Sequence, residues 1–178
     1  MEMFMYKEGH FDDVLKLYSD AFSGPPLNYD FITPVKAERY IRSIINTPGF
    51  LGYTFWSADS HNTEIIFPRD LNPIKAENPE KNLDDLCGGM YMTAFVFGVL
   101  DDYFEGVLYS ISEFAVSPFM QRKGVGSAVL GMLENRLSTN GVDAVNLNTS
   151  IHLPAYGFYK KNGYQEVAEN VSFMKWLV

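Results

Sequence analysis

One segment limits the possible folds of this chain more than any other. It consists of a β-rich run over 107–116, a Ser117-Pro118 turn and a glycine-containing loop, Gln121–Ser127, that leads into a run with helical apolar spacing. The first turn of a helix leaves backbone N–H groups unpaired and carries the positive end of the helix dipole. Glycines let the backbone close around an anion. Arg122 and Lys123 add positive charge, so the segment predicts a strand–loop–helix unit with a diphosphate site.

Three kinds of nucleotide-binding loop can be separated by their glycine spacing. A Walker A loop requires Gly-x-x-x-x-Gly-Lys-Ser/Thr, which the sequence lacks. A dinucleotide fingerprint requires a third glycine where this chain has Val129, and it follows a parallel strand rather than an antiparallel run. The third kind is Gln/Arg-x-x-Gly-x-Gly/Ala after a Val-x-Pro strand exit. Val116-Ser117-Pro118 and Gln121–Gly126 fit this third kind.

The apolar periodicity of the whole chain predicts an α/β fold. Helices are expected over 11–22, 34–46, 124–139 and 154–161. Strands are expected over 3–7, 50–56, 90–100, 107–116, 144–148, 164–168 and 172–177, with Asp101-Asp102 as the turn between two antiparallel strands. The polar stretch 58–85 is expected to be an insertion or long loop within a single domain that spans 1–178.

Charge and cysteine content restrict the function classes. The net charge of −8 disfavours nucleic acid and anionic membranes as partners and favours a cationic small molecule, although solubility alone also explains it. Cys87 is the single cysteine, which excludes an internal disulfide and fits a reducing compartment. The N-terminus resembles no signal peptide and no segment is long and apolar enough to span a membrane, so we expect a cytoplasmic protein. The histidines show no metal-ligand spacing, and no metal site is expected.

A second motif lies about 35 residues beyond the glycine loop. Residues 155–164, Ala-Tyr-Gly-Phe-Tyr-Lys-Lys-Asn-Gly-Tyr, match the pattern Ala-x-x-Φ-Tyr-x-x-x-Gly-Φ, where Φ is apolar or aromatic. Together, the two motifs resemble the GNAT superfamily of acetyl-CoA-dependent N-acetyltransferases. The resemblance is strongest from Ile111 to Tyr164, is weaker over the first two predicted helices, and fails over the polar stretch 58–85.

This resemblance implies a fold and a donor site. The fold would be a mixed, mostly antiparallel twisted sheet with flanking helices and splayed central parallel strands. Acetyl-CoA would be the acetyl donor, with its pantetheine arm in the gap between those strands. The residues that the resemblance assigns to the donor are Phe114, Ala115, Val116, Gln121, Arg122, Lys123, Gly124, Val125, Gly126, Ser127 and Tyr159.

The resemblance also implies catalytic residues. Tyr159 stands at the family's general-acid position, where a phenol would protonate the departing thiolate. Glu113 stands on the central strand, where many members carry a carboxylate that acts as base, although an exposed or substrate-binding glutamate is an equal alternative. His152 replaces the asparagine that members often have, and a helix-capping role is the simpler interpretation for it.

The acceptor is the least defined part of the prediction. In this family the loop between the first two helices forms part of the acceptor cleft, which here gives Tyr29 and Asp30. Glu113 would also contact the acceptor, and Trp56, Tyr91 and Tyr109 are further aromatic candidates, with ordinary loop or core packing as the alternative for each of these residues. We expect the primary amine of a small cationic molecule, with a peptide or protein amine, or a non-catalytic acyl-CoA-binding domain, as alternatives. A homodimer paired through the final residues, 172–178, is compatible with the sequence.

Overall fold

The computed structural model describes residues 1–24, 33–58, 90–103 and 106–167, and the chain divides into two units, Met1–Leu147 and Asn148–Val178. The first unit contains β1 (Glu2–Met5), η1 (Glu8–His10), α1 (Phe11–Ser23), α2 (Pro34–Ile45), β2 (Phe50–Ser57), β3 (Tyr91–Tyr103), β4 (Gly106–Val116), η3 (Pro118–Met120), α3 (Val125–Thr139) and β5 (Ala144–Leu147). The second unit contains α4 (Pro154–Lys161). All of these helices and strands except the two short 3-10 turns η1 and η3 were predicted, with boundaries shifted by a few residues.

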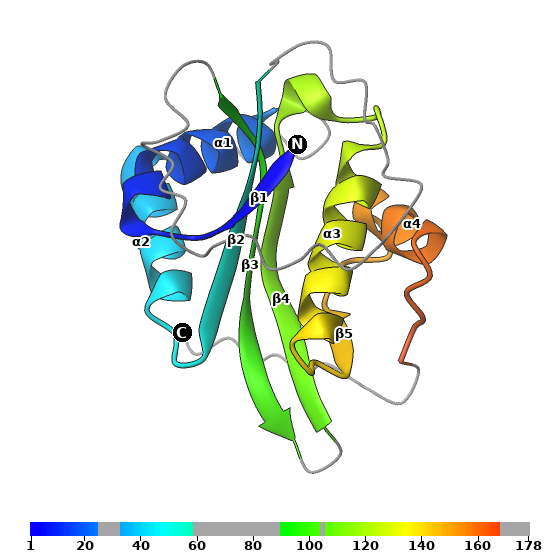
Figure 1. Cartoon of the computed structure of the whole chain (residues 1–178). Helices are drawn as coiled ribbons and strands as arrows, with labels where there is room; N and C mark the ends of the chain where they lie inside the picture. Colours follow the sequence, from blue (N-terminus) through cyan, green and yellow to red (C-terminus); the bar gives the residue numbers. More distant parts are fainter. Residues whose placement is uncertain (25–32, 59–89, 104–105, 168–178) are drawn as a thin grey trace, which may run out of the picture. The chain divides into compact units, whose positions relative to one another are not determined.

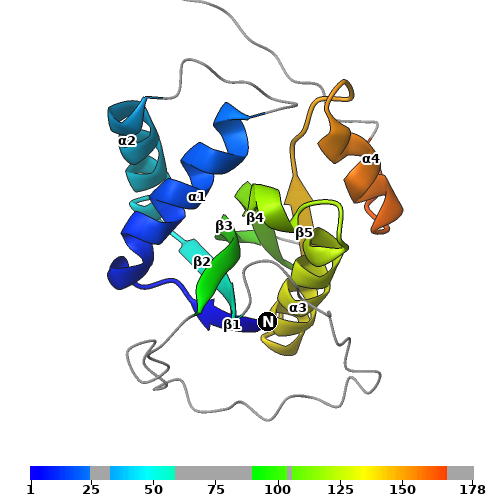
Figure 2. The same cartoon turned by 90° about the horizontal axis from the view of Figure 1, so that it is seen from above.

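The first unit is a five-stranded sheet between two helical layers. The strands are in the order β1-β2-β3-β4-β5; the pairs are antiparallel except β4 and β5, which run parallel. Helices α1 and α2 pack on one face, and α3 packs on the other (Figures 1 and 2). This arrangement confirms the predicted mixed, mostly antiparallel α/β sheet with flanking helices; its parallel pair, β4–β5, lies at one edge of the described sheet.

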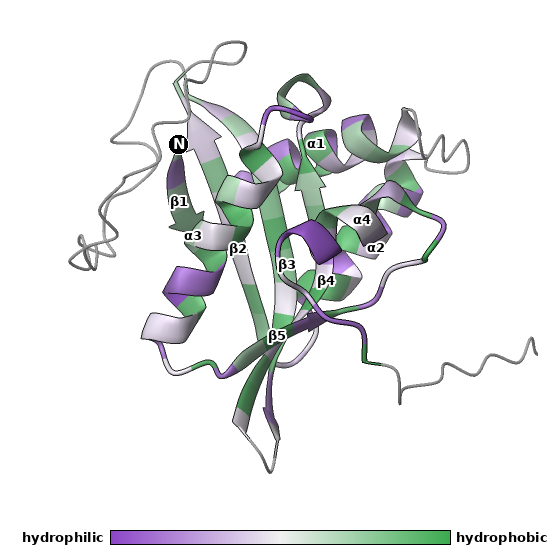
Figure 3. Ribbon diagram, turned by 90° about the vertical axis from the view of Figure 1, so that its right-hand side faces the viewer, coloured by the Kyte–Doolittle hydropathy of each residue, from purple (hydrophilic) through white to green (hydrophobic). Residues whose placement is uncertain are grey.

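Local sequence signals explain how the helices begin and end. Thr33 caps α2 by accepting a hydrogen bond from the backbone N–H of Lys36, and Pro34 occupies the first helical position. On α3 the residues facing the sheet are buried, namely Val125, Val129, Leu130, Leu133 and Leu137. In Figure 3 this helix lies along the sheet, and the central strands carry the hydrophobic colours. Gly141, with φ 79°, ends α3 in the left-handed conformation that glycine adopts most easily.

An apolar core fills the space between the sheet and the helices α1 and α2. Its buried members include Val14 and Ile41 from the helices and Phe95, Phe97 and Ala115 from the strands.

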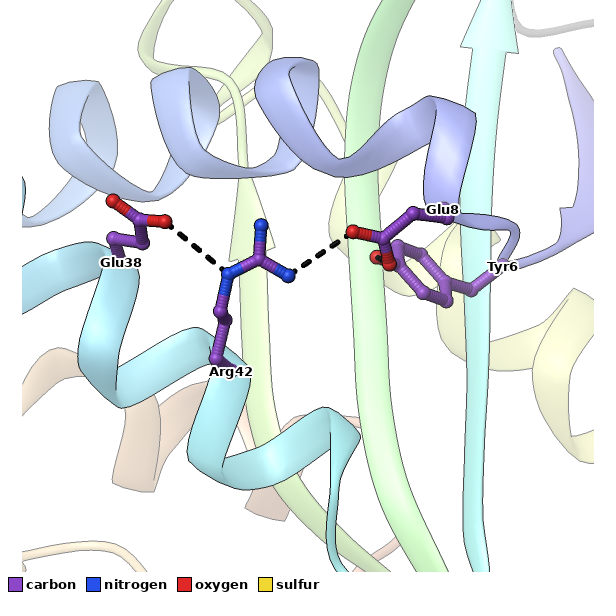
Figure 4. Close-up of polar contacts among 4 residues, drawn as sticks. All are labelled: Tyr6, Glu8, Glu38 and Arg42. Carbon is purple, nitrogen blue, oxygen red and sulfur yellow. Dashed lines mark hydrogen bonds and ion pairs between the residues drawn. The ribbon is translucent and has the colours of Figure 1, made fainter.

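Near this core, the guanidinium of Arg42 on α2 bonds Glu8 at 3.0 Å and Glu38 at 3.2 Å (Figure 4). Because these pairs are solvent-exposed, they orient the helix more than they stabilise it.

Two sequence predictions about strands are wrong. Asp101 and Asp102 do not form the turn: they pair with Leu108 and Val107, and β3 continues to Tyr103. A local turn propensity is therefore overridden by the longer β3–β4 ladder. The strand expected over 164–168 does not form at 164–167, where Glu166 instead bonds the side chains of Tyr156 and Lys160. Residue 168, the expected strand 172–177 and nearly all of the stretch 58–85 lie outside the described residues.

Candidate active site

A β-bulge in β4 decides which face of the sheet Glu113 occupies. Phe97 of β3 pairs with Glu113, but the next residue, Gly98, pairs with Ile111, so Ser112 is an extra residue in β4. Side chains alternate between faces along a strand, and one extra residue reverses this alternation. Without the bulge Glu113 would share the face of Tyr109 and Ile111. With it, Glu113 lies beside Phe97 on the face covered by α1 and α2.

The carboxylate of Glu113 is held by a side chain from α2. The phenol of Tyr40 donates a hydrogen bond to Oε2 of Glu113 at 3.1 Å, across 73 residues of sequence. Glu113 is half-buried. Burial raises its pKa from 4.5 to about 7, while the hydrogen bonds from Tyr40 and from the backbone of Phe114 oppose the rise. A carboxylate with a pKa near neutrality can exchange protons at physiological pH, which a general base requires.

The tyrosine that bonds this carboxylate packs against further aromatic side chains of the two helices. The ring of Tyr40 lies 5.6 Å from that of Tyr18, which lies 4.7 Å from that of Phe22. Tyr18 is buried, whereas Tyr40 keeps 41% of its surface exposed. Sequence reasoning missed Tyr40 and Tyr18 because nothing in the helical pattern distinguishes them from other aromatic residues. The predicted acceptor residues Tyr29 and Asp30 lie outside the described residues.

Two of the further aromatic candidates belong to the core instead. Trp56 is buried, and its indole N–H donates to Oγ1 of Thr54 at 3.0 Å. Tyr109 is buried, and its hydroxyl donates to the carbonyl of Leu51 at 2.8 Å. Since both polar groups are bonded inside the protein, neither side chain lines a cleft, and the alternative of core packing holds for both. Tyr91 is 53% exposed at the start of β3.

The strand β4 runs past its parallel neighbour before it enters the glycine loop. The β4–β5 ladder ends at the pair Ile111–Leu147, and β4 continues to Val116. The predicted donor residues Phe114, Ala115 and Val116 therefore lie in the part of β4 beyond that ladder. Ala115 is buried in the core under α1 and α2. The parallel pairing thus ends one residue before the bulge.

The loop is fixed at its start and open at its centre. Met120 is buried and anchors η3, and the side-chain amide of Gln121 donates to the carbonyl of Val116 at 3.0 Å. Residues 121–124 are exposed. Arg122 and Gly124 adopt left-handed conformations, with φ 62° and 82°. For an arginine this conformation is uncommon, and such turns direct backbone N–H groups toward one side.

The first turn of α3 has the features expected of an anion-binding helix start. The first helical hydrogen bond runs from Ala128 N–H to the carbonyl of Gly124, at 3.1 Å. The amides of Val125, Gly126 and Ser127 precede that bond and have no carbonyl of the helix to pair with. No acidic residue occupies the first turn, and Arg122 and Lys123 lie immediately before it. Helix-start amides, two cations and a glycine turn fit a diphosphate.

Tyr159 lies on α4, in the unit Asn148–Val178. Its ring packs against the rings of Phe158 and Tyr164, at 5.1 and 5.4 Å, and its carbonyl accepts the backbone N–H of Tyr164 at 3.1 Å. His152 does not cap this helix: the N-cap residue is Leu153, and no side chain bonds the helix start. The capping interpretation of His152 is therefore wrong.

Two classes of feature are absent from the part of the chain that the structure describes. No group of three or more histidine, cysteine, aspartate or glutamate side chains is arranged to hold a metal ion there. Over the same residues, no helix combines the length and the apolar character needed to cross a bilayer.

Comparison with known proteins agrees with this geometry. Residues 84–166 match the family model of the acetyltransferase (GNAT) domain. No curated protein matches the chain in sequence. Solved structures share the fold at low identity. An aminoglycoside 6'-N-acetyltransferase from Acinetobacter haemolyticus has a TM-score of 0.61 and 12% identity, with 100% of each chain covered.

Two further structures show the same fold. A possible acetyltransferase from Clostridium difficile 630 has a TM-score of 0.65 and 9% identity, and the match covers 99% of this chain and 98% of that one. An aminoglycoside acetyltransferase from an uncultured soil metagenomic sample, in complex with sisomicin, has a TM-score of 0.60 and 12% identity, with 99% and 96% covered. Residues 84–166 therefore match the acetyltransferase (GNAT) domain, and the chain shares its fold with solved acetyltransferase structures.

Proposed function

We propose that this acetyltransferase moves the acetyl group of acetyl-CoA to the primary amine of a small cationic acceptor. One observation carries the proposal. The strand that presents Glu113, a carboxylate with a pKa near 7, leads directly into the exposed glycine loop at the start of α3. Amine acetylation requires a proton acceptor for the amine and an anion site for the pyrophosphate of the donor. One short segment of this chain carries a candidate for each, one at either end.

The donor site in this proposal uses the loop and the end of β4. The amides of Val125, Gly126 and Ser127 would bind the pyrophosphate, assisted by the charges of Arg122 and Lys123. Gln121 would support the loop through its bond to Val116. Gly124 would provide the turn. The backbone of residues 114–116 would lie along the pantetheine arm, as the family resemblance implies.

The chemistry assigns one proton to each of two side chains. When bound, acetyl-CoA supplies a thioester whose carbonyl carbon an amine can attack, forming a C–N bond as the C–S bond breaks. An acceptor amine is mostly protonated at neutral pH. Glu113 would therefore take the ammonium proton, directly or through water, and release the lone pair for attack. Tyr159 would give a proton to the departing thiolate and recover, directly or through water, the second proton that the acceptor nitrogen loses as the amide forms.

Charge and aromatic surface support a cationic acceptor. The chain carries a net charge of −8, which attracts cations. The exposed ring of Tyr40 beside Glu113 offers both a π-face and a carboxylate to an ammonium group. Two structures of the same fold are aminoglycoside acetyltransferases, and aminoglycosides are polycationic amines. Tyr29 and Asp30 remain predicted acceptor contacts.

The test is a panel of acceptors assayed for acetyl-CoA-dependent thiol release, with acetylated product identified by mass spectrometry. The panel contains simple amines, polyamines, aminoglycosides and peptides with free N-termini. Turnover with small cationic amines, abolished by Glu113→Gln, would support the proposal. Turnover with peptides alone would move the acceptor to a peptide or protein amine. Acetyl-CoA binding without turnover on any acceptor would favour a non-catalytic acyl-CoA-binding domain.

Two further expectations from the sequence remain predictions. The single cysteine fits a reducing environment, and we keep the cytoplasm as the expected compartment. A homodimer through residues 172–178 lies outside the described residues, and sedimentation analysis would decide it.

A further inference from the structure

We propose that Tyr40 is a positioning residue for acetyl transfer: its phenol, held against Tyr18, donates to Glu113 and keeps that carboxylate ionised and oriented for the acceptor. The inference rests on the proposed role of Glu113 as the base. It adds a residue from α2 to a reaction for which the sequence indicated no residue of that helix.

The meeting of Tyr40 and Glu113 depends on the bulge in β4. The extra residue Ser112 turns Glu113 toward the layer of α1 and α2. Tyr40 lies in the second turn of α2, and its hydroxyl reaches Oε2 of Glu113 at 3.1 Å. Because Glu113 is half-buried, its carboxylate loses part of its hydration, and a donated hydrogen bond replaces some of it.

The tyrosine is held in place by aromatic packing. Its ring lies against Tyr18 at a 35° interplanar angle, and Tyr18 lies against Phe22 at the same angle. Tyr18 is buried in the core of α1 and α2, so it provides a fixed support. Only the outer side of Tyr40 remains exposed. The phenol is therefore directed to Glu113 before any acceptor binds, which lowers the cost of orienting the base.

The direction of the hydrogen bond is set by the charges around the pair. Burial and the neighbouring Glu113 carboxylate raise the pKa of Tyr40 above its ordinary range, so Tyr40 stays a donor at physiological pH. The groups on this side of Glu113 are Tyr40 from α2, Tyr18 behind it on α1, and the uncharged Phe97 opposite in β3. Among the described residues no lysine, arginine or histidine forms an ion pair with Glu113.

Tyr40 therefore favours the charged form of Glu113, against the effect of burial. Removing the phenol should make the carboxylate harder to ionise. The acid limb of the pH–rate profile should then move to higher pH by about one pH unit, which corresponds to a roughly tenfold loss of kcat/KM below the limb. At pH values well above the limb, the activity should approach that of the wild type.

The test compares the pH dependence of kcat/KM for the wild type, Tyr40→Phe and Tyr6→Phe. The phenylalanine keeps the ring and removes only the hydroxyl. Tyr6 is a matched control, since its phenol also donates to a glutamate, Glu8, at 3.3 Å (Figure 4). We expect a raised acid limb in Tyr40→Phe alone. An unmoved limb in Tyr40→Phe, or equal shifts in both variants, would overturn the inference.

A second readout does not require turnover. Carbon-13 NMR of the glutamate carboxyls, with Glu113→Gln for assignment, measures the titration midpoint of Glu113 in the unliganded protein. The midpoint should rise in Tyr40→Phe and stay in place in Tyr6→Phe. If no amine is acetylated by the wild type, the proposed function fails. If acetylation occurs and neither the midpoint nor the acid limb moves, the Tyr40 inference alone fails.

Discussion

The substitution Glu113→Gln should make the protein more stable at neutral and alkaline pH while it removes catalysis. Burial raises the pKa of Glu113 from 4.5 to about 7 in the folded state. Because the pKa of Glu113 is higher in the folded than in the unfolded state, the protonated carboxyl stabilises the folded protein. This stabilisation is complete below pH 4.5 and is lost as the pH rises through 7. At 1.36 kcal/mol per pH unit, that loss amounts to roughly 3 kcal/mol at pH 8.

Glutamine removes this loss because it cannot ionise. Its amide oxygen can still accept the hydrogen bond from Tyr40, so the packing around position 113 is retained. For a protein of this size, roughly 3 kcal/mol corresponds to a rise of about 6–12 °C in Tm. Acetyl transfer should fall by about a hundredfold or more, as expected when a general base is removed.

The assay is urea unfolding and thermal unfolding of both proteins at about pH 5 and pH 8. The stability gain should be present at pH 8 and should fall to roughly 1 kcal/mol at pH 5, where the carboxyl is protonated in the folded state but still mostly ionised in the unfolded state. Glu2→Gln is the control, because Glu2 is exposed on β1. A variant that is no more stable than the wild type at pH 8 would refute the reasoning, as would a gain that does not depend on pH.

The remaining predictions concern His10 and Tyr159. His10 is buried, its Nδ1 accepts from Lys7 N–H and lies 3.1 Å from Oγ1 of Thr54, and burial lowers its pKa below 6.5. Its stabilising effect is therefore present above pH 6.5 and is lost as the pH falls. We expect His10→Gln to reduce the acid-induced drop in Tm between about pH 7.5 and 5.5, and an unchanged drop would contradict this account. Tyr159→Phe should lower turnover by roughly a hundredfold at near-normal acetyl-CoA affinity by calorimetry; unchanged turnover would remove Tyr159 from the mechanism.

Features encoded locally could be predicted from the sequence. The loop Gln121–Ser127 and the start of α3 depend on glycine, on two cations and on the unpaired amides of a first helical turn. The helix caps at Thr33 and Gly141 were also predictable, because a cap depends only on residues that are close to it in the sequence. Helices α1 and α4 begin and end close to where the apolar period and proline place them.

Features that depend on distant contacts could not be predicted. The bulge at Ser112 follows from how β4 pairs with β3, and simple alternation would place Glu113 on the face of Tyr109. The bond from Tyr40 to Glu113 joins segments 73 residues apart. The aromatic residues Trp56 and Tyr109 could not be assigned to core or cleft, since strand periodicity shows only which side chains share a face. The sequence Asp101-Asp102 is typical of a turn, but in the structure both residues continue the pairing of β3 with β4.

The central claim, that the loop before α3 binds a coenzyme A thioester, is tested most directly by calorimetric titration with acetyl-CoA. The wild type should bind acetyl-CoA, and neither ATP nor NAD should compete at equal concentration. The double variant Arg122→Ala/Lys123→Ala should bind roughly tenfold more weakly, whereas Lys16→Ala/Lys36→Ala, with the same change in net charge on α1 and α2, should bind normally. Absence of acetyl-CoA binding to the wild type, or equal weakening in both double variants, would contradict the account.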